Sequence, residues 1–520
     1  MEKLNKKNIC KKSINYLGNF LPEILIFSLL FCTYLYPRII KQYIFSYAGL
    51  YMQMTNDLLQ NNFILPLNTP YYGPGGIPYA YPPLAFYVGA VVMKILDITI
   101  IGFVRYFPIV FYTGAVIALY FLVRRMSGSR AKGIFAAILY GTSNIGYIYH
   151  AQESGMVRGL GLFFALVALV AFYNVFNNQK HTWSSIIGTI CLACTALTSF
   201  TYLMFLIFSI LVFFLFGKEH FSKRIINAVI ICVAAALLTL PWVISMVDRY
   251  GFSTFVNASG THGGIFYFLR FNTVGSFISG ILNLFQEWKW LGNLTPELGL
   301  VLFGLSFAIF KRKWIFPVWF GVVFLFVGES GRFLFVVGAA LAAEAVIDIF
   351  ISMDTGTIKM NFHQKVIRVM PVLLLVFYFW GNFFLQLKDS KSVDIPDIID
   401  LSSWFQDNTK SNSSYLLVSE YTDLGYSENL PFFIKRTPVV LPWGSEWTKN
   451  NDHQLHMAQY LGNCVQHDDP ECFSTFYQQM KLSPDYLVTF NDQTKVTQSI
   501  ENDPGWKMVY SNPKFLVYQQ

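Results

Sequence analysis

The sequence predicts an all-α polytopic membrane domain of about eleven transmembrane helices, followed by a C-terminal α/β domain outside the membrane. Of the 520 residues, 54% are hydrophobic and 13% are charged, against roughly a quarter charged in soluble proteins. Residues 388–520 hold 10 Lys+Arg and 17 Asp+Glu, a net charge of −7, whereas residues 1–387 hold 28 and 13, a net charge of +15. This change of sign predicts a boundary between a membrane domain, 1–387, and a soluble domain, 388–520.

Apolar stretches of about 17–25 residues predict the spans, and the Lys/Arg content of short loops orients them. Five lysines precede the first span, which places the N-terminus in the cytoplasm. With the ends of some spans extended into their flanks, the predicted spans are 21–36, 107–123, 133–149, 157–176, 184–197, 203–216, 225–247, 298–310, 314–327, 333–351 and 366–385. Two long loops, 42–105 and 248–294, then lie outside.

The distribution of basic residues supports this orientation. The predicted cytoplasmic segments are short, yet they hold 19 of the 28 Lys+Arg in residues 1–387. Segment 84–96 is apolar but only thirteen residues long, which is typical of a helix at the membrane interface. Counting it as a span would place the basic loop 124–132 outside, so we assign it to the interface, after a loop helix around 51–59.

The soluble region alternates short strand-like segments with polar helical ones. The expected strands are 415–419, 437–441 and 486–489, a pattern that favours a small α/β domain. Cys464 and Cys472 lie eight residues apart and are the two cysteines of this region. Because an extracytoplasmic compartment permits oxidation, we predict a disulfide between them.

Ionisable side chains at membrane level are costly and therefore mark candidate sites. Most of the acids and bases predicted near the external face lie in the two long loops and in the turns around residues 150–158 and 328–332. Carboxylates and arginines above a bundle of helices suit an anionic substrate with a long lipid tail, because arginines bind phosphate well.

The first long loop carries a distinctive motif, residues 71–84, YYGPGGIPYAYPPL. An N-in first span, a loop helix, this motif and an interfacial helix together resemble the GT-C superfamily of membrane glycosyltransferases. That group includes lipid-linked aminoarabinose transferases, protein O-mannosyltransferases and the oligosaccharyltransferase catalytic subunit. Three further segments agree in order: 124–128, RRMSG; 150–155, HAQESG; and Pro241-Trp242 leading to Arg249-Tyr250-Gly251.

The resemblance implies a transferase that moves a hexosyl or pentosyl group from a polyprenyl-phosphate donor to an extracytoplasmic glycan, lipid or protein. Such a transfer needs a base for the acceptor hydroxyl and positive charge beside the departing phosphate. The candidate catalytic residues are Glu153, as base or metal ligand, and Asp57. The candidates for binding substrate or phosphate are Arg332, Arg158, Arg249, His262, Glu329 and Tyr81.

A divalent metal ion is the one cofactor considered. The expected partners are the lipid bilayer, the lipid-linked donor and the acceptor, with no nucleic acid. The expected location is the cell membrane of a bacterium or archaeon, with the C-terminal domain facing outward.

One departure from the family pattern keeps an alternative open. Members of the superfamily usually carry an acidic residue at the start of the first-loop helix, where this chain has Tyr47 and Ala48. The alternative is therefore a non-catalytic relative that binds a lipid-linked glycan or a partner protein. A lipid or solute transporter is a third possibility, disfavoured because the chain shows neither an internal repeat nor paired broken spans.

The charge bias generates a first testable prediction. Protease added to intact cells should remove residues 388–520, because the orientation places them outside. Protection of this region, together with cleavage in the 124–132 loop by the added protease, would show that the topology is inverted.

Overall fold

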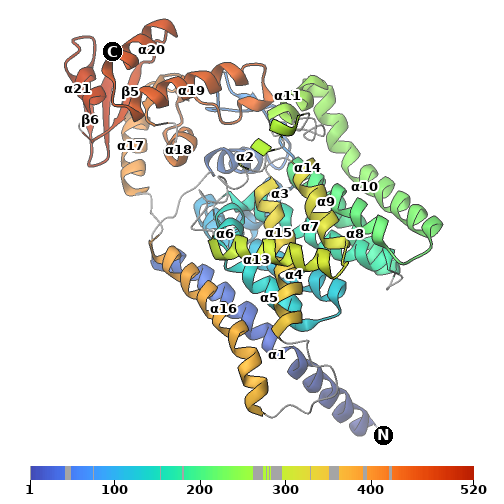
Figure 1. Cartoon of the computed structure of the whole chain (residues 1–520). Coiled ribbons are helices and arrows are strands. Elements are labelled where there is room, and N and C mark those ends of the chain that lie inside the picture. Colours follow the sequence, from blue (N-terminus) through green and yellow to red (C-terminus); the bar gives the residue numbers. More distant parts are fainter. Residues whose placement is uncertain are drawn as a thin grey trace.

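The computed structural model describes residues 2–40, 48–73, 75–152, 154–177, 181–261, 273–276, 278–279, 282, 295–327, 330–350, 362–389, 395–420, 424–492 and 494–520. A helical bundle occupies the first three quarters of the chain, and a sheet with helices follows (Figure 1). The helices of the bundle are α1 (Glu2–Ile40), α4 (Ile100–Ser127), α5 (Arg130–Gly141), α6 (Asn144–His150), α7 (Gly155–Phe176), α8 (His181–Ala196), α9 (Phe200–Phe216), α10 (Phe221–Tyr250), α11 (Ser253–Thr261), α13 (Thr295–Phe310), α14 (Ile315–Phe326), α15 (Ser330–Phe350) and α16 (Phe362–Asp389). The segment between α1 and α4, predicted to be the first external loop, contains α2 (Gly49–Gln60), β1 (Asn68–Thr69), β2 (Ile77–Pro78) and α3 (Leu84–Leu96).

The chain is a multi-pass membrane protein. Among the described residues, six helices are long and apolar enough to cross a membrane: α1 over Phe20–Ile40, α4, α7, α10, α15 over Gly331–Phe350 and α16 over Val369–Leu387. Shorter apolar helices are α3, α8, α9, α13 and α14. Helix α3 has the bounds expected for the interfacial segment, and the total of eleven spans stays a prediction.

The segment expected as one span, 133–149, is divided into α5 and α6. Thr142 Oγ1 donates to the Ile138 carbonyl (2.8 Å), and Ser143 Oγ accepts from the Gly146 amide (3.1 Å). Ser143 is therefore the N-cap of a new helix, a role that serine fulfils well. The hydrophobicity pattern did not reveal this break, which positions α6 to carry Tyr149 and His150.

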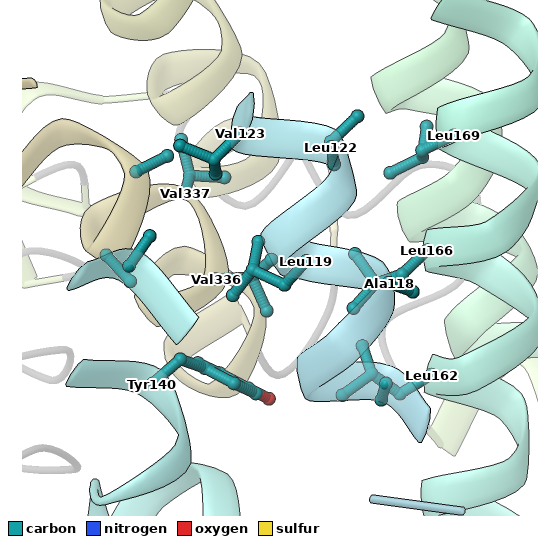
Figure 2. Packing of buried hydrophobic residues seen from close by; sticks show 14 of the residues in the cluster. Ala118, Leu119, Leu122, Val123, Tyr140, Leu162, Leu166, Leu169, Val336 and Val337 are labelled. Carbon is teal, nitrogen blue, oxygen red and sulfur yellow. The ribbon is translucent and has the colours of Figure 1, made fainter. Parts of the chain in front are cut away.

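Apolar packing between α4, α7 and α15 forms the centre of the bundle (Figure 2). Figure 2 shows Ala118, Leu119, Leu122 and Val123 of α4 between side chains of the other two helices. Residues 162, 166 and 169 of α7 follow helical spacing and meet this face. Because lipid is as apolar as these side chains, close van der Waals packing holds such helices together.

Charged side chains form a network between α5, the segment before α14, and the C-terminal half of α15. Lys132 lies 2.9 Å from Glu344 and 2.6 Å from Asp348. Lys313 lies 2.8 Å from Asp348 and also contacts Glu344. Two cations thus pair with two carboxylates at one end of α15. Their mutual attraction offsets the free-energy cost of burying the charges.

The C-terminal region contains a five-stranded sheet of order β4-β3-β5-β7-β6. Strands β4, β3 and β5 are parallel, and β7 is antiparallel to β5 and β6. Its elements are α17 (Ile395–Asn408), β3 (Ser414–Val418), α18 (Leu424–Ile434), β4 (Thr437–Pro438), η2 (Ser445–Trp447), α19 (Asn451–Gln466), α20 (Pro470–Gln479), β5 (Tyr486–Phe490), α21 (Lys495–Glu501), β6 (Lys507–Ser511) and β7 (Phe515–Gln519). Strand β4 is shorter than the expected 437–441, and β6 and β7 were not predicted.

Alternation along the strands gives the sheet two apolar faces. Leu416 and Val418 of β3 face a cluster with α19, α20 and α21. Tyr415 and Leu417 face α17 and α18, in a cluster that continues into α2, α3 and the start of α4. The loop between α1 and α4 and this face of the sheet therefore share one apolar core.

Cys464 and Cys472, the pair expected from the sequence, form a disulfide with their Cα atoms 5.3 Å apart. It joins the end of α19 to the start of α20. Replacing both by alanine should lower the stability of the C-terminal region by about 2–3 kcal/mol, because the cross-link no longer restricts the unfolded chain. The loss of stability can be measured by thermal unfolding, with limited proteolysis used to monitor the C-terminal region. Free thiols at both positions in protein prepared without reductant would contradict the assignment.

Candidate active site

Two arginines converge on one aromatic ring at the starts of two helices. The guanidinium of Arg158, in the first turn of α7, lies 5.6 Å from the Tyr149 ring centroid. The guanidinium of Arg332, near the start of α15, lies 5.3 Å from the same centroid and 5.5 Å from that of Tyr202. Arg332 is 3% exposed. Since helix N-termini are also electropositive, this point of the structure favours an anion.

Helix α2, which carries Tyr51, shares an apolar cluster with the start of α7, the helix of Arg158. Burial raises the pKa of Tyr51, while Arg158 and Arg332 lower it and the carboxylates Glu428 and Glu446 raise it further. All four charges therefore act on one phenol, although they come from widely separated parts of the sequence.

Tyr81, from the aromatic motif, completes this side of the site. Its hydroxyl donates to Glu446 Oε1, and its ring lies 6.1 Å from Tyr51 and 4.9 Å from Trp447. The predicted residues Arg158, Arg332 and Tyr81 therefore belong to one neighbourhood, which we call the Arg158–Arg332 site. Their part in binding stays a prediction.

Glu428 of α18 binds the start of α2. Its Oε2 accepts from the amides of Ala48 and Gly49, both at 2.8 Å, and its Oε1 accepts from the Leu50 amide at 3.0 Å. Burial raises the pKa of Glu428 to about 7, against the lowering effect of these three amides and of Arg158. A carboxylate thus reaches the helix start that lacks an acid of its own.

Asp57 lies near the other end of α2. It accepts a 2.6 Å hydrogen bond from Gln53 Nε2, and burial raises its pKa to about 6. Six residues along a helix turn a side chain by about 120°, so Asp57 and Tyr51 point to different sides. The electrostatic neighbours of Asp57 include Tyr72 and Tyr79, and its catalytic role stays a prediction.

Arg249 contacts the first loop at a different place. Its Nη1 donates to the Leu65 carbonyl (3.0 Å) and the Pro66 carbonyl (3.3 Å). The next residue, Tyr250, donates to the Leu67 carbonyl. The C-terminal end of α10 is therefore hydrogen-bonded to the backbone of residues 65–67.

Three predicted site residues, Glu153, His262 and Glu329, lie outside the described residues. Within the part of the chain that is described, no group of three or more His, Cys, Asp or Glu side chains is placed to hold a metal ion.

Sequence reasoning missed Glu428 and Glu446. Both lie in the C-terminal region, more than 350 residues from the loop groups that they contact. No local pattern marks a residue for a contact at this separation. The acid-poor start of α2 was the one available signal that a carboxylate was needed from elsewhere.

The comparisons with known proteins agree with this architecture. A family model described as dolichyl-phosphate-mannose-protein mannosyltransferase matches residues 80–244. No curated protein matches the sequence significantly. The matched region includes α3, α6 and α7, and therefore Arg158.

Several solved structures are similar. The Archaeoglobus fulgidus oligosaccharyltransferase, tethered with an acceptor peptide containing the NVT sequon, has a TM-score of 0.63 at 11% identity, over 97% of this chain and 74% of that one. ArnT from Cupriavidus metallidurans, bound to undecaprenyl phosphate, has a TM-score of 0.53 at 14% identity, over 96% of this chain and 98% of that one. The arabinofuranosyltransferase AftD from Mycobacteria has a TM-score of 0.52 at 12% identity, over 95% of this chain and 39% of that one.

The archaeal oligosaccharyltransferase has also been solved with an inhibitory peptide and a dolichol-phosphate, and with Zn and sulfate. At these identities the likeness concerns the fold. The expected resemblance is confirmed: this chain has the fold of the GT-C membrane glycosyltransferases.

The buried carboxyl of Asp57 generates a stability prediction. Its pKa is higher in the folded state than in the unfolded state, so wild-type stability should fall as the pH rises through about 4 to 6. Asp57→Asn keeps an oxygen acceptor for Gln53 and removes this loss. The variant should therefore be more stable than wild type at pH 8, on the order of 1–3 kcal/mol, and similar at pH 4. Thermal melts in detergent across this range, with the exposed Asp452→Asn as control, measure the difference. A wild type that gains stability over the variant with rising pH would contradict it.

Proposed function

We propose that this chain, which has the GT-C fold, is a membrane glycosyltransferase that moves a sugar from a polyprenyl-phosphate donor to an extracytoplasmic acceptor. The observation that carries the proposal is the convergence of Arg158 and Arg332 on Tyr149. Two guanidinium groups at helix starts suit a phosphate whose lipid tail lies among the membrane helices.

The proposed transfer consists of three events. The acceptor hydroxyl oxygen attacks the anomeric carbon, the bond from that carbon to the phosphate oxygen breaks, and a base takes the hydroxyl proton. Arg158 and Arg332 are suited to stabilise the negative charge that develops on the departing lipid phosphate. We propose Glu153 as the base or as a metal ligand, from its position in the sequence between α6 and α7.

Asp57 is the second candidate base. Its pKa of about 6 lies near the operating pH of a general base, but the structure directs it away from Tyr51. The donor and acceptor types seen with the similar structures, lipid phosphates and a peptide, support a lipid-linked donor. We leave the class of sugar and of acceptor open.

Removal of the Arg332 charge tests the proposal. Arg332→Ala should weaken binding of a polyprenyl phosphate by about 1.5–3 kcal/mol, because charge-assisted hydrogen bonds to the phosphate are lost. Arg332→Lys should fall between this variant and wild type, because a lysine keeps the charge without the bidentate geometry. Binding of a fluorescent polyprenyl phosphate and transfer from labelled polyprenyl-phosphate sugars by the purified protein provide the two measurements.

The matched control is Arg125→Ala, an exposed arginine in the last turn of α4. It should bind and transfer as wild type does. Equal binding and transfer by Arg332→Ala, at equal expression and melting temperature, would exclude this arginine from the donor site. Wild-type protein that binds the lipid phosphate but transfers none of the sugars offered would favour the non-catalytic alternative.

A further inference from the structure

Helix α2 begins without a capping side chain of its own. Its N-cap residue, Ala48, has no hydrogen-bond acceptor in its side chain, and the first turn of the helix has no acidic residue. The first amides of a helix have no partner within it, and here the helix start is buried: Ala48 is 0% and Leu50 is 3% exposed. The amides of residues 48–50 must therefore be satisfied from outside the helix.

Glu428 satisfies these three amides from 378–380 residues away. The approach is close, because a Cβ atom on Gly49 would collide with the Glu428 carbonyl oxygen and would lie 2.7 Å from the Asn429 Cα. The Tyr72 hydroxyl also donates to the Glu428 carbonyl (3.0 Å). Figure 1 shows α18 beside α2, between the sheet and the membrane helices.

The same carboxylate is poorly suited to act as a base. Glu428 is 3% exposed, and its two oxygens already accept three hydrogen bonds. An acceptor hydroxyl could reach it only if α2 moved away. Its chemistry is therefore that of a charged anchor on the helix start, where the positive end of the helix dipole adds to the attraction.

The anchored helix carries a group of the Arg158–Arg332 site. Tyr51 follows directly after Leu50, and it packs against the apolar cluster that contains Leu50 and also Met156 and Val157, the two residues before Arg158 in α7. A change in the orientation of α2 would move Tyr51, and Tyr81 beside it, relative to the two arginines.

We propose that Glu428 is a positioning residue for sugar transfer: it lets the C-terminal region fix α2, and with it Tyr51, against the Arg158–Arg332 site. This inference rests on the proposed function. The carboxylate at this helix start comes from α18, because neither Ala48 nor the first turn of α2 supplies one.

The test compares Glu428→Gln with Glu471→Gln in the full-length protein. Glu471 is an exposed glutamate of the same region, in the first turn of α20, and should behave as wild type. Glu428→Gln keeps the size of the side chain but turns one acceptor into an NH₂ that faces amide donors. Hydrogen exchange in the peptide covering residues 48–60, measured without substrate, should then be faster in this variant alone.

Transfer kinetics give the second readout. Glu428→Gln should lower kcat by about 10–100-fold, the cost expected from a displacement of about 1 Å at a reacting centre, with little change in the KM for the donor because both arginines remain. If Glu428→Gln cannot be purified, the Glu428→Ala/Ala48→Asp double variant returns a carboxylate to the same helix start and should keep most of the wild-type kcat.

Four results separate the possible failures. Unchanged exchange in residues 48–60 together with an unchanged kcat would overturn the inference, as would a folded double variant without activity. A donor KM that rises while kcat stays constant would assign Glu428 to binding and would also overturn it. Wild-type protein without transfer would overturn the proposed function, while the exchange experiment would still decide whether Glu428 holds α2.

Discussion

An apolar bilayer makes buried charge costly, and this constraint orders the whole structure. Helix α15 illustrates it. Arg332 lies near its start, and Glu344 and Asp348, paired with Lys132 and Lys313, lie near its other end. The twelve helical steps from Arg332 to Glu344 span about 18 Å, and the side chains between these two residues are apolar and buried. The charged side chains of α15 are thus confined to its two ends, where they have different roles.

At one end the charges compensate each other and hold helices together. At the other end, Arg158 and Arg332 gather positive charge around Tyr149, beside a loop helix and the C-terminal region. Because one apolar core joins that loop to the sheet, the C-terminal region is part of the site's scaffold. Glu428 and Glu446 are the polar contacts of that shared core.

The sequence predicted much of the fold, because hydrophobic length and basic loops are strong local signals. The interfacial helix 84–96 and the loop helix were placed within two residues of their observed bounds. The break at Ser143 was missed because a single capping serine in an apolar segment barely changes its hydropathy. Strands β6 and β7 were missed because their pairing depends on β5 rather than on a pattern within themselves.

The candidate site was predictable only in part, for a related reason. Arg158, Arg332 and Tyr81 could be named because charges and aromatic groups at span ends stand out in an apolar sequence. Arg249 looks the same by that criterion, yet it holds the carbonyls of residues 65 and 66. Glu428 lies in an acidic region rich in ordinary surface carboxylates, so only the three-dimensional structure distinguishes it.

The most direct test of the central claim is an experimental structure of the protein with a polyprenyl phosphate bound. The account predicts the phosphate within hydrogen-bonding distance of both Arg158 and Arg332, close to Tyr149, with the lipid chain among the membrane helices. A phosphate bound away from these two arginines, with both guanidinium groups engaged only by protein groups, would contradict it.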